Sequence, residues 1–506
     1  MDEYRNVLER IGDRVSMAEP AFERLRRRRD RRSRIDRVVA VSVGLILAAA
    51  ATGVVVRAFD ASDRPRPASL GPETVSELEL AWVGTLGQPE AEFGTGVATA
   101  SSPVVEDGIV YVGSADRRLY AFEAGCGQGG EKCDPLWTAT TSDRIASTPA
   151  VAGGIVYVAS QDGGLYAFPA ECSSPCEPLW TASVGGYVRR GSPVVAGGTV
   201  YMMSQRTVGQ QQPNDSTSLY AYPAECGTVG AYCEAIWKAF EGRVSYSTPS
   251  VHEGFVYAPM GDGVYVFRAD CGTEGSTCQP LWRARGFAPL FASVAIAADR
   301  VFVADADRLV ALPSTCDGAR CAPVWVSRSR GTAYSALTTN DGMVFVGTTS
   351  FPHPQDPTNT LPALLAFSAD CVPPGATGGC DPVWRGTGME GFVEAPPTAA
   401  KGLVFIAMNS SDLESGVLYA FDQECGREAG TCEPLWSEPI DGTTGLSSPA
   451  VADGVVYLSA GGKLLAFDLR SGPPSARTWL PIAIVGLVVL LAAVMIWLRR
   501  RMVSTA

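Results

Sequence analysis

The sequence predicts an all-β fold, an eight-bladed β-propeller that is closed by an N-terminal strand and flanked by two transmembrane helices. Three observations lead to this prediction. A strand-rich unit recurs about every 49 residues through the middle of the chain. A lone strand precedes the first unit, whereas the last unit lacks its final strand. The two longest apolar runs lie at opposite ends of the 506 residues.

The predicted organisation has seven segments. In order they are a basic cytoplasmic tail (1–37), a transmembrane helix (38–56), a linker (57–77), an extracytoplasmic propeller (78–470), a second linker (471–478), a second transmembrane helix (479–498) and a cytoplasmic tail (499–506).

Each apolar run is long enough to cross a bilayer core. Residues 1–37 hold 12 arginines against 8 acidic residues, and Arg499, Arg500 and Arg501 follow the second run. By the positive-inside rule both termini are therefore expected in the cytoplasm, at the plasma membrane. A cleaved signal peptide is the alternative for the first run, because Ala49-Ala50-Ala51 could mimic a cleavage site. The long charged segment before the run favours an uncleaved anchor.

The formal net charge of the chain is −12. The N-terminal tail carries a net charge of +4 and the C-terminal tail +3, which leaves −19 on the residues between them. An acidic surface argues against nucleic acid or anionic lipid headgroups as partners of the extracytoplasmic part.

Eight units make up the middle of the chain; the first seven each predict four antiparallel strands, and the eighth predicts three. Pairs such as Asp107-Gly108 and Gly153-Gly154 favour primed two-residue turns between the first and second strands. The third strands carry LYAF-like sequences. The first strands are expected to begin at Ser102, Thr148, Ser192, Thr248, Ser293, Ser335, Pro396 and Ser448. The fourth strands are expected to end on Trp137, Trp180, Trp237, Trp282, Trp325, Trp384 and Trp436.

The lone strand, Leu78–Gly84, and the missing fourth strand of the last unit complement each other. If Leu78–Gly84 supplies the outer strand of blade eight, the two ends of the domain meet in one sheet. An open array would leave exposed strand edges, so closure is the favourable arrangement.

The repeats resemble the pyrroloquinoline-quinone (PQQ) repeats of a known propeller family. Unit one contains SSPVV, DG, IVYVGS and LYAF before its Trp, and unit eight reads SSPAVADGVVYLSAGGKLLAFD. Quinoprotein dehydrogenases and the outer-membrane assembly lipoprotein propeller are built from such repeats. The resemblance implies the propeller fold but leaves function open, because the family includes both enzymes and binding scaffolds.

Two further features indicate an actinobacterial source. Only four of the 41 basic residues are lysine, which is typical of a GC-rich genome. The N-terminal tail is similar to the tails of actinobacterial single-span proteins that are associated with transcriptional regulation.

All fourteen cysteines lie in the predicted extracytoplasmic part, and they form seven local pairs between third and fourth strands. A zinc site needs four converging ligands, whereas these pairs are spread around a ring. We therefore expect disulfides in an oxidising compartment and no metal or cofactor site. The predicted disulfides are Cys126–Cys133, Cys172–Cys176, Cys226–Cys233, Cys271–Cys278, Cys316–Cys321, Cys371–Cys380 and Cys425–Cys432.

The strand order separates two faces. The fourth-to-first and second-to-third connections lie on one face, which we call the distal face, and the disulfide turns lie on the other. The distal connections are long at 204–218, 349–362 and 409–416, and insertions on one face of a repeat array often mark a binding face.

Aromatic and arginine side chains, which are favoured in binding hot spots, occur in the fourth-to-first loops of the distal face. The alternative is that most of them are ordinary packing residues. The candidates for a binding face are Arg144, Tyr187, Arg189, Arg190, Arg243, Tyr246, Phe291, Tyr334, Phe392 and Glu394. Phe93 and Phe287 also lie in these fourth-to-first loops.

Catalytic features are scarce in the sequence. No two cysteines are adjacent, as the ring that stacks on PQQ in quinoprotein dehydrogenases would require. The two histidines, His252 and His353, do not supply a nucleophilic triad. The sequence therefore predicts a membrane-anchored, non-catalytic propeller that binds a protein or cell-envelope ligand. The alternatives are a transmembrane sensor that relays binding to a cytoplasmic regulator, and a PQQ-dependent dehydrogenase.

Overall fold

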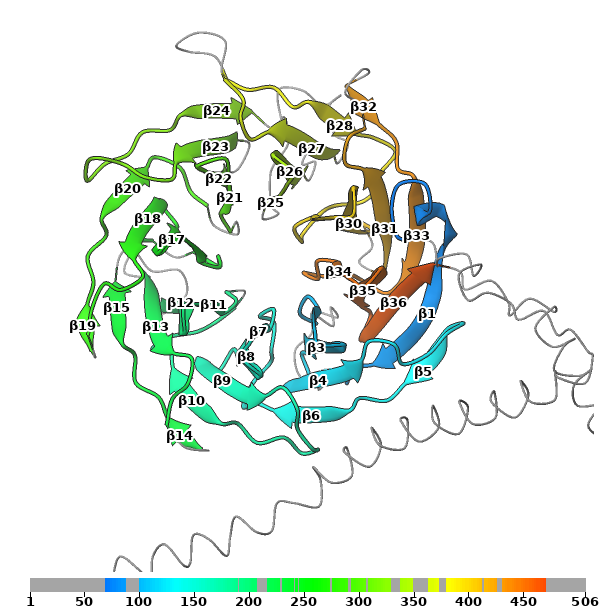
Figure 1. Cartoon of the computed structure of the whole chain (residues 1–506), viewed down its shortest axis with the longest axis horizontal. Coiled ribbons are helices and arrows are strands. Elements are labelled where there is room, and N and C mark those ends of the chain that lie inside the picture. Colours follow the sequence, from blue (N-terminus) through cyan, green and yellow to red (C-terminus); the bar gives the residue numbers. More distant parts are fainter. Residues whose placement is uncertain are drawn as a thin grey trace, which may run out of the picture. The chain divides into compact units, whose positions relative to one another are not determined.

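The computed structural model contains one β-rich unit made of eight sheets arranged around a central axis (Figure 1). The chain divides into units 1–67 and 68–506. The structure describes residues 69–87, 100–189, 191–206, 216–227, 230–240, 242–243, 245–273, 275–289, 293–305, 308–328, 337–348, 363–372, 379–411, 414–425 and 430–469. In these ranges no helix has the length and apolar character to cross a membrane. The predicted membrane segments 38–56 and 479–498, and both tails, lie outside the described residues.

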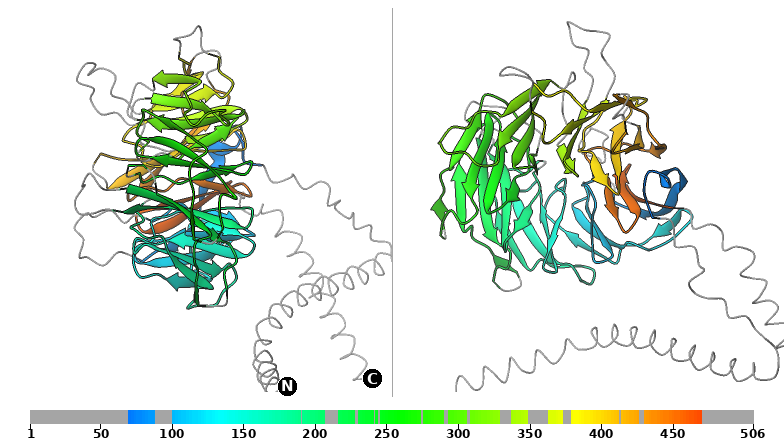
Figure 2. Two further views of the ribbon diagram at one scale, coloured as in Figure 1. Left: turned by 90° about the vertical axis from the view of Figure 1, so that its left-hand side faces the viewer. Right: turned by 45° about the horizontal axis from the view of Figure 1, so that its top comes forward.

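Each sheet is one blade, and its four main strands run outward from the axis in chain order except in blade 8, where β1 is outside β36 (Figures 1 and 2). Blade 1 contains β2 (Val104–Glu106), β3 (Ile109–Gly113), β4 (Arg118–Glu123) and β6 (Trp137–Thr140). Blade 2 contains β7 (Ala150–Ala152), β8 (Ile155–Ala159), β9 (Gly164–Pro169) and β10 (Trp180–Ser183). Blade 3 contains β11 (Val194–Ala196), β12 (Thr199–Arg206), β13 (Ser216–Pro223) and β15 (Trp237–Phe240). Blade 4 contains β16 (Ser250–His252), β17 (Phe255–Met260), β18 (Gly263–Arg268) and β20 (Trp282–Arg285).

The second half of the ring repeats this arrangement. Blade 5 contains β21 (Ala295–Ala297), β22 (Arg300–Asp305), β23 (Arg308–Pro313) and β24 (Trp325–Arg328). Blade 6 contains β25 (Leu337–Asn340), β26 (Met343–Thr348), β27 (Ala363–Ser368) and β28 (Trp384–Gly386). Blade 7 contains β29 (Thr398–Ala400), β30 (Leu403–Asn409), β31 (Ser415–Asp422) and β33 (Trp436–Asp441). Blade 8 contains β34 (Ala450–Ala452), β35 (Val455–Ala460), β36 (Lys463–Leu469) and β1 (Leu78–Thr85), and a short 3-10 helix, η3 (Val75–Glu77), precedes β1.

The inner hairpins have the predicted primed geometry. At Asp107-Gly108 the two central residues have φ of 49° and 75°, and the corresponding pairs in the other blades also have positive φ. A turn with positive φ at two successive residues has a backbone twist that matches the right-handed twist of the flanking strands. Glycine at the second position adopts a positive φ without a Cβ clash.

The ring closes as the sequence predicts. β1 pairs antiparallel with β36, from Leu78 opposite Leu469 to Thr85 opposite Lys463. Figure 1 shows the blue N-terminal strand beside the orange-red C-terminal one. The two ends of the domain therefore share one sheet, and blade 8 has no free outer edge.

The prediction that the fourth strands end on tryptophan is wrong. These strands begin at the tryptophan, as β6 does at Trp137 and β15 at Trp237, and continue for two to five further residues. The side chains of the first six of these tryptophans are buried, whereas Trp436 is half-buried.

All seven predicted cysteine pairs are disulfides, with Cα atoms 5.7–6.2 Å apart. The loops do more than make a turn. Short strands in four of them pair in parallel with the outer strand of the preceding blade: β5 (Glu131–Cys133) with β1, β14 (Ala231–Tyr232) with β10, β19 (Ser276–Thr277) with β15, and β32 (Thr431–Cys432) with β28. Four sheets therefore have five strands, where four were predicted.

The remaining disulfide loops make the same connection with fewer bonds. Cys176 forms an isolated parallel β-bridge with Ala139 of blade 1, and Arg320 forms one with Arg283 of blade 4. The Ser327 hydroxyl of blade 5 donates a hydrogen bond to the carbonyl of Cys380 in blade 6. The second cysteine of every pair is buried, at 9% exposure or less. Each disulfide loop is thus a strap between neighbouring blades.

A second connection between blades is a clamp on one carbonyl group. Directly after the third strand, the carbonyl of Ala224 accepts hydrogen bonds from Trp180 Nε1 (3.1 Å) and the Tyr157 hydroxyl (3.0 Å) of the preceding blade. The carbonyls of Ala124, Ala170 and Ala269 accept the same two kinds of donor. At Ala124 the donors are Trp82 and Tyr457, so one residue from each end of the domain completes the clamp.

The clamp predicts a graded stability response. Tyr157→Phe removes one hydroxyl but leaves the Trp180 bond, so it should lower the free energy of unfolding by about 1 kcal/mol. Trp180→Phe removes a buried donor and opens a cavity, so it should cost about 3 kcal/mol. Denaturant unfolding measures both, and Tyr232→Phe, at a tyrosine that is 59% exposed, is the control. Equal stability of all three variants would contradict the clamp.

The clamp tyrosines also predict alkaline sensitivity. Burial, supported by nearby carboxylates, raises the pKa of the clamp residues Tyr111 and Tyr157 from 10.0 to about 12. The folded state favours the neutral phenol, so this stabilisation is complete below pH 10 and is lost as the pH rises from 10 to about 12. Phenolate absorbance and circular dichroism should change together in that interval. Titration of these tyrosines near their ordinary pKa with the fold intact would contradict the prediction.

Candidate functional site

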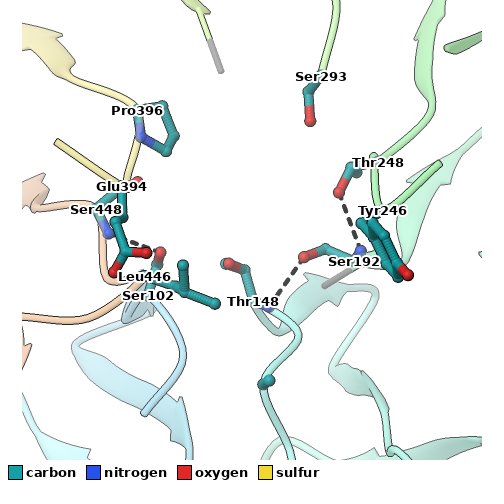
Figure 3. A pocket seen from close by; sticks show the side chains of 11 residues that line it. Ser102, Thr148, Ser192, Tyr246, Thr248, Ser293, Glu394, Pro396, Leu446 and Ser448 are labelled. Atoms are coloured by element: carbon teal, nitrogen blue, oxygen red, sulfur yellow. Dashed lines mark hydrogen bonds between the residues drawn. The ribbon is translucent and has the colours of Figure 1, made fainter. Parts of the chain in front are cut away.

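A hydroxyl-lined cavity of about 290 Å³ lies where the innermost strands of the blades begin (Figure 3). Six of its side chains are serine or threonine, and they are the residues that the repeat pattern predicts as the starts of first strands. The lining consists of Ser102, Ala146, Thr148, Ser192, Tyr246, Thr248, Ser293, Glu394, Pro396, Leu446 and Ser448.

Several of these hydroxyl groups connect one blade with the next. The Thr148 N–H donates to Ser192 Oγ (2.9 Å), and the Ser192 N–H donates to Thr248 Oγ1 (3.0 Å). The Ser448 N–H donates to Ser102 Oγ (2.9 Å), which joins blade 8 to blade 1. These oxygens are structural acceptors, and their own O–H groups can still donate to a polar molecule in the cavity.

The cavity has one charged lining residue, Glu394, on the side opposite Tyr246 (Figure 3). A single carboxylate with neutral hydroxyls offers hydrogen bonds but no acid–base pair. Within the described ranges, no group of three His, Cys, Asp or Glu residues could hold a metal ion.

Four of the predicted binding-face residues form one cluster, which we call the arginine–tyrosine cluster: Arg144, Tyr187, Arg189 and Tyr246. The guanidinium carbon of Arg189 lies 5.7 Å from the centre of the Tyr246 ring, within the range of a cation–π contact. Burial raises the pKa of Tyr187, the charges of Asp143 and Tyr246 act in the same direction, and Arg189 and Arg144 act against them. Tyr187 therefore lies within the electrostatic reach of both arginines.

The backbone beneath this cluster is held by the end of β12. Tyr187 and Gln205 exchange two backbone hydrogen bonds, of 2.7 and 2.9 Å, and the Arg189 N–H donates to Gln205 Oε1 (3.2 Å). The Tyr187 hydroxyl donates to Gln161 Oε1 (2.9 Å), which fixes the ring while 39% of the residue stays exposed. Gln205 is fully buried, and among the residues that the structure describes its Nε2 has no hydrogen-bond partner.

Phe392 and Glu394 occupy the equivalent loop before blade 7. Phe392 and Asn409 exchange two backbone hydrogen bonds of 2.9 Å, in the same way as Tyr187 and Gln205. The buried Asn409 Oδ1 accepts hydrogen bonds from Thr443 Oγ1 (2.7 Å), Thr444 Oγ1 (2.9 Å) and two backbone N–H groups. Glu394 therefore belongs to a second site of the cavity rim rather than to the arginine–tyrosine cluster.

The structure corrects the predicted distal loops of blades 3 and 7. β12 continues to Arg206 and β13 begins at Ser216, so 204–206 and 216–218 are strand, while 207–215 lie outside the described residues. β30 likewise includes Asn409, and β31 begins at Ser415. The third long connection, 349–362, lies outside the described residues.

The other binding-face candidates do not join either group. Arg243 is exposed, and its carbonyl accepts hydrogen bonds from Thr217 Oγ1 and the Gly261 N–H. Phe287 is buried at 6% exposure, as the packing alternative expects. Phe93, Arg190, Phe291 and Tyr334 lie outside the described residues.

Sequence reasoning missed Gln205 and Asn409, which hold the two loops. The signal was present, because each amide ends an otherwise apolar strand, after YMMS in blade 3 and FIAM in blade 7. A buried amide at such a position needs several partners, so it indicates a nearby loop that supplies them.

A family model described as outer membrane protein assembly factor BamB matches residues 51–229 and 377–478, which is more than half of the chain. The chain belongs to this family. Comparison with curated proteins gave no match.

Solved structures resemble the fold of this BamB-family chain at low sequence identity. BamB from Moraxella catarrhalis is 12% identical, with a TM-score of 0.52, and the match covers 78% of this chain and 99% of that one. A quinohemoprotein alcohol dehydrogenase from Pseudomonas putida is 14% identical, with a TM-score of 0.54 and coverage of 80% and 78%. A quinohemoprotein alcohol dehydrogenase from Comamonas testosteroni is 14% identical, with a TM-score of 0.53 and coverage of 81% and 79%. These likenesses establish the propeller fold and carry no function with them.

The Asn409 network predicts a strong destabilisation on substitution. Asn409→Ala leaves several buried donors without an acceptor, so it should lower the free energy of unfolding by about 2–3 kcal/mol. Ser411→Ala, at an exposed residue beside the same hairpin, is the matched control. Equal unfolding midpoints of the two variants would show that the network does not hold the loop.

Proposed function

We propose that the protein is a non-catalytic scaffold that binds a protein or cell-envelope ligand through the distal face of its propeller. The arginine–tyrosine cluster carries this proposal. Arg189 and Tyr187 are exposed, and their backbone is fixed by Gln205. A rigid backbone frame reduces the conformational entropy that the loop loses on binding, and arginine and tyrosine are enriched in binding hot spots.

The alternative of a PQQ-dependent dehydrogenase has less support. All fourteen cysteines are held in disulfide loops. The cavity lining contains no tryptophan, and its one charged residue, Glu394, would repel the carboxylates of PQQ. The residues present do not fit this cofactor. Addition of PQQ with calcium, followed by a dye-linked alcohol oxidation assay, tests the alternative directly.

Membrane anchoring belongs to the same proposal. The two apolar runs, 38–56 and 479–498, would hold the propeller outside the plasma membrane, with both termini in the cytoplasm. The pairing of Leu78 with Leu469 supports it, because the chain enters and leaves the propeller at one place. In the sensor variant of this proposal, residues 1–37 relay binding to a cytoplasmic regulator. Loss of a cytoplasmic partner on deletion of residues 1–34 would favour the sensor over the scaffold.

Site-specific photocrosslinking in whole cells tests the binding face. A photoreactive phenylalanine analogue at Tyr187 should give a protein adduct, and Arg189→Ala should reduce its yield several-fold. The same analogue at Tyr232, which is 59% exposed in a disulfide loop, is the matched control on the other face. Adducts from Tyr232 alone, or a Tyr187 adduct that is unaffected by Arg189→Ala, would contradict the proposal.

A further inference from the structure

A second cavity, of about 440 Å³, lies between blades 1 and 2 on the disulfide face. One wall consists of Ile109 and Tyr111 of β3 and the turn residues before them. The other wall is the turn Gly153-Gly154 of blade 2 and the chain that leads from β9 into the disulfide loop. The cavity is therefore a crevice between two blades, next to the carbonyl clamp at Ala170.

Three carboxylates line this crevice: Glu106, Asp107 and Glu171. All three residues are exposed, and none of them makes an ion pair within the part of the chain that the structure describes. Their charge reaches the crevice, because burial together with Asp107, Glu171 and Glu106 raises the pKa of Tyr111 to about 12. The crevice thus combines negative charge with an apolar wall.

The equivalent crevice between blades 5 and 6 already contains a guanidinium group. Arg300 Nη1 donates to the carbonyls of Ala369 and Cys371, both at 2.8 Å. Arg300 is the first residue of β22 and pairs with Ala297, as Ile109 is the first residue of β3 and pairs with Glu106. In the same way, Ala369 and Cys371 correspond to Ala170 and Cys172 of blade 2.

Arg300 is the only charged residue at this position among the eight blades, where the others have Ile109, Ile155, Thr199, Phe255, Met343, Leu403 and Val455. The Ala369 carbonyl is available to Arg300 because Phe302 replaces the clamp tyrosine, and in the described part of the chain Trp325 Nε1 has no hydrogen-bond partner. Blade 5 therefore demonstrates, within this chain, that the crevice admits an arginine side chain.

We propose that the crevice between blades 1 and 2 binds an arginine side chain of a partner protein. In this crevice Tyr111 and Trp137 occupy the Ala170 carbonyl, and the three carboxylates provide the acceptors instead. A guanidinium group presents a planar fork that matches carboxylates, which an ammonium group does not. The aliphatic stem of the arginine would pack on Ile109, Val151 and Pro169. This site lies on the disulfide face and is independent of the distal site proposed above.

Short peptides test the proposal on the purified propeller, by calorimetry at low ionic strength. The probe is the amidated peptide Gly-Arg-Gly, with the lysine peptide and the neutral citrulline peptide as comparisons. We expect the arginine peptide to bind most tightly and the citrulline peptide not to bind. Equal affinity for the arginine and citrulline peptides would overturn the proposal, because it would remove the role of the charge.

Variants locate the binding. Ile109→Arg with Tyr111→Phe reproduces the residues of blade 5 and should fill the crevice, so that the arginine peptide no longer binds. Ile155→Arg with Tyr157→Phe makes the same chemical changes one blade further on and should leave binding intact. Glu106→Gln with Glu171→Gln, at exposed positions that the fold tolerates, should weaken binding at least about fivefold. Unchanged affinity in both the filled and the Gln variants would overturn the assignment to this crevice.

Discussion

Half of the ring depends on one kind of shared acceptor, the carbonyl that follows the third strand in blades 1 to 4. Such a carbonyl has two lone pairs, and at Ala124, Ala170, Ala224 and Ala269 the neighbouring blade occupies both with a tryptophan N–H and a tyrosine O–H. At these four boundaries each blade therefore satisfies a buried carbonyl that belongs to the next one. At Ala124 the two donors come from opposite ends of the domain, so neither end satisfies the carbonyl without the other.

The disulfide straps and the clamp act on the same boundary. The clamped carbonyl lies two residues before the first cysteine at Ala124, Ala170, Ala224 and Ala269, and the second cysteine is buried against the preceding blade. Closing so short a loop contributes only about 2–3 kcal/mol through chain entropy. Its larger effect is to hold the short parallel strand in place, which covers the outer edge of the neighbouring sheet. Blade 7 has no such strap after it, and Leu70 and Val75 of the N-terminal segment pack in the cluster that contains its Ile440.

The sequence predicts the part of this structure that is periodic and local. The hairpin turns, the cysteine pairs and the joining of Leu78–Gly84 to the last unit follow from spacing alone. The straps and the clamp could not be predicted in the same way, because they join residues more than 30 positions apart, such as Trp180 and Ala224. The position of tryptophan at the start of the outer strand follows from this contact and not from strand propensity. The arginine–tyrosine cluster was foreseen as a set of residue types, whereas its support by Gln205 required the extended hairpin of blade 3.

The contacts between neighbouring blades decide where the sequence can vary. The clamp, the straps and the hydroxyl groups around the central cavity all connect blades, so substitutions there affect the ring itself. Two kinds of position nevertheless differ from blade to blade: the ends of the second-to-third hairpins and the first residue of each second strand. At the hairpin ends, Gln205 of blade 3 pairs with Tyr187, and Asn409 of blade 7 pairs with Phe392. At the first residue of the second strand, blade 5 has Arg300 where blade 1 has Ile109. Arg300 fills the crevice between blades 5 and 6, whereas the crevice between blades 1 and 2 is open. Binding sites in a closed ring of repeats are thus expected at the positions where the blades differ.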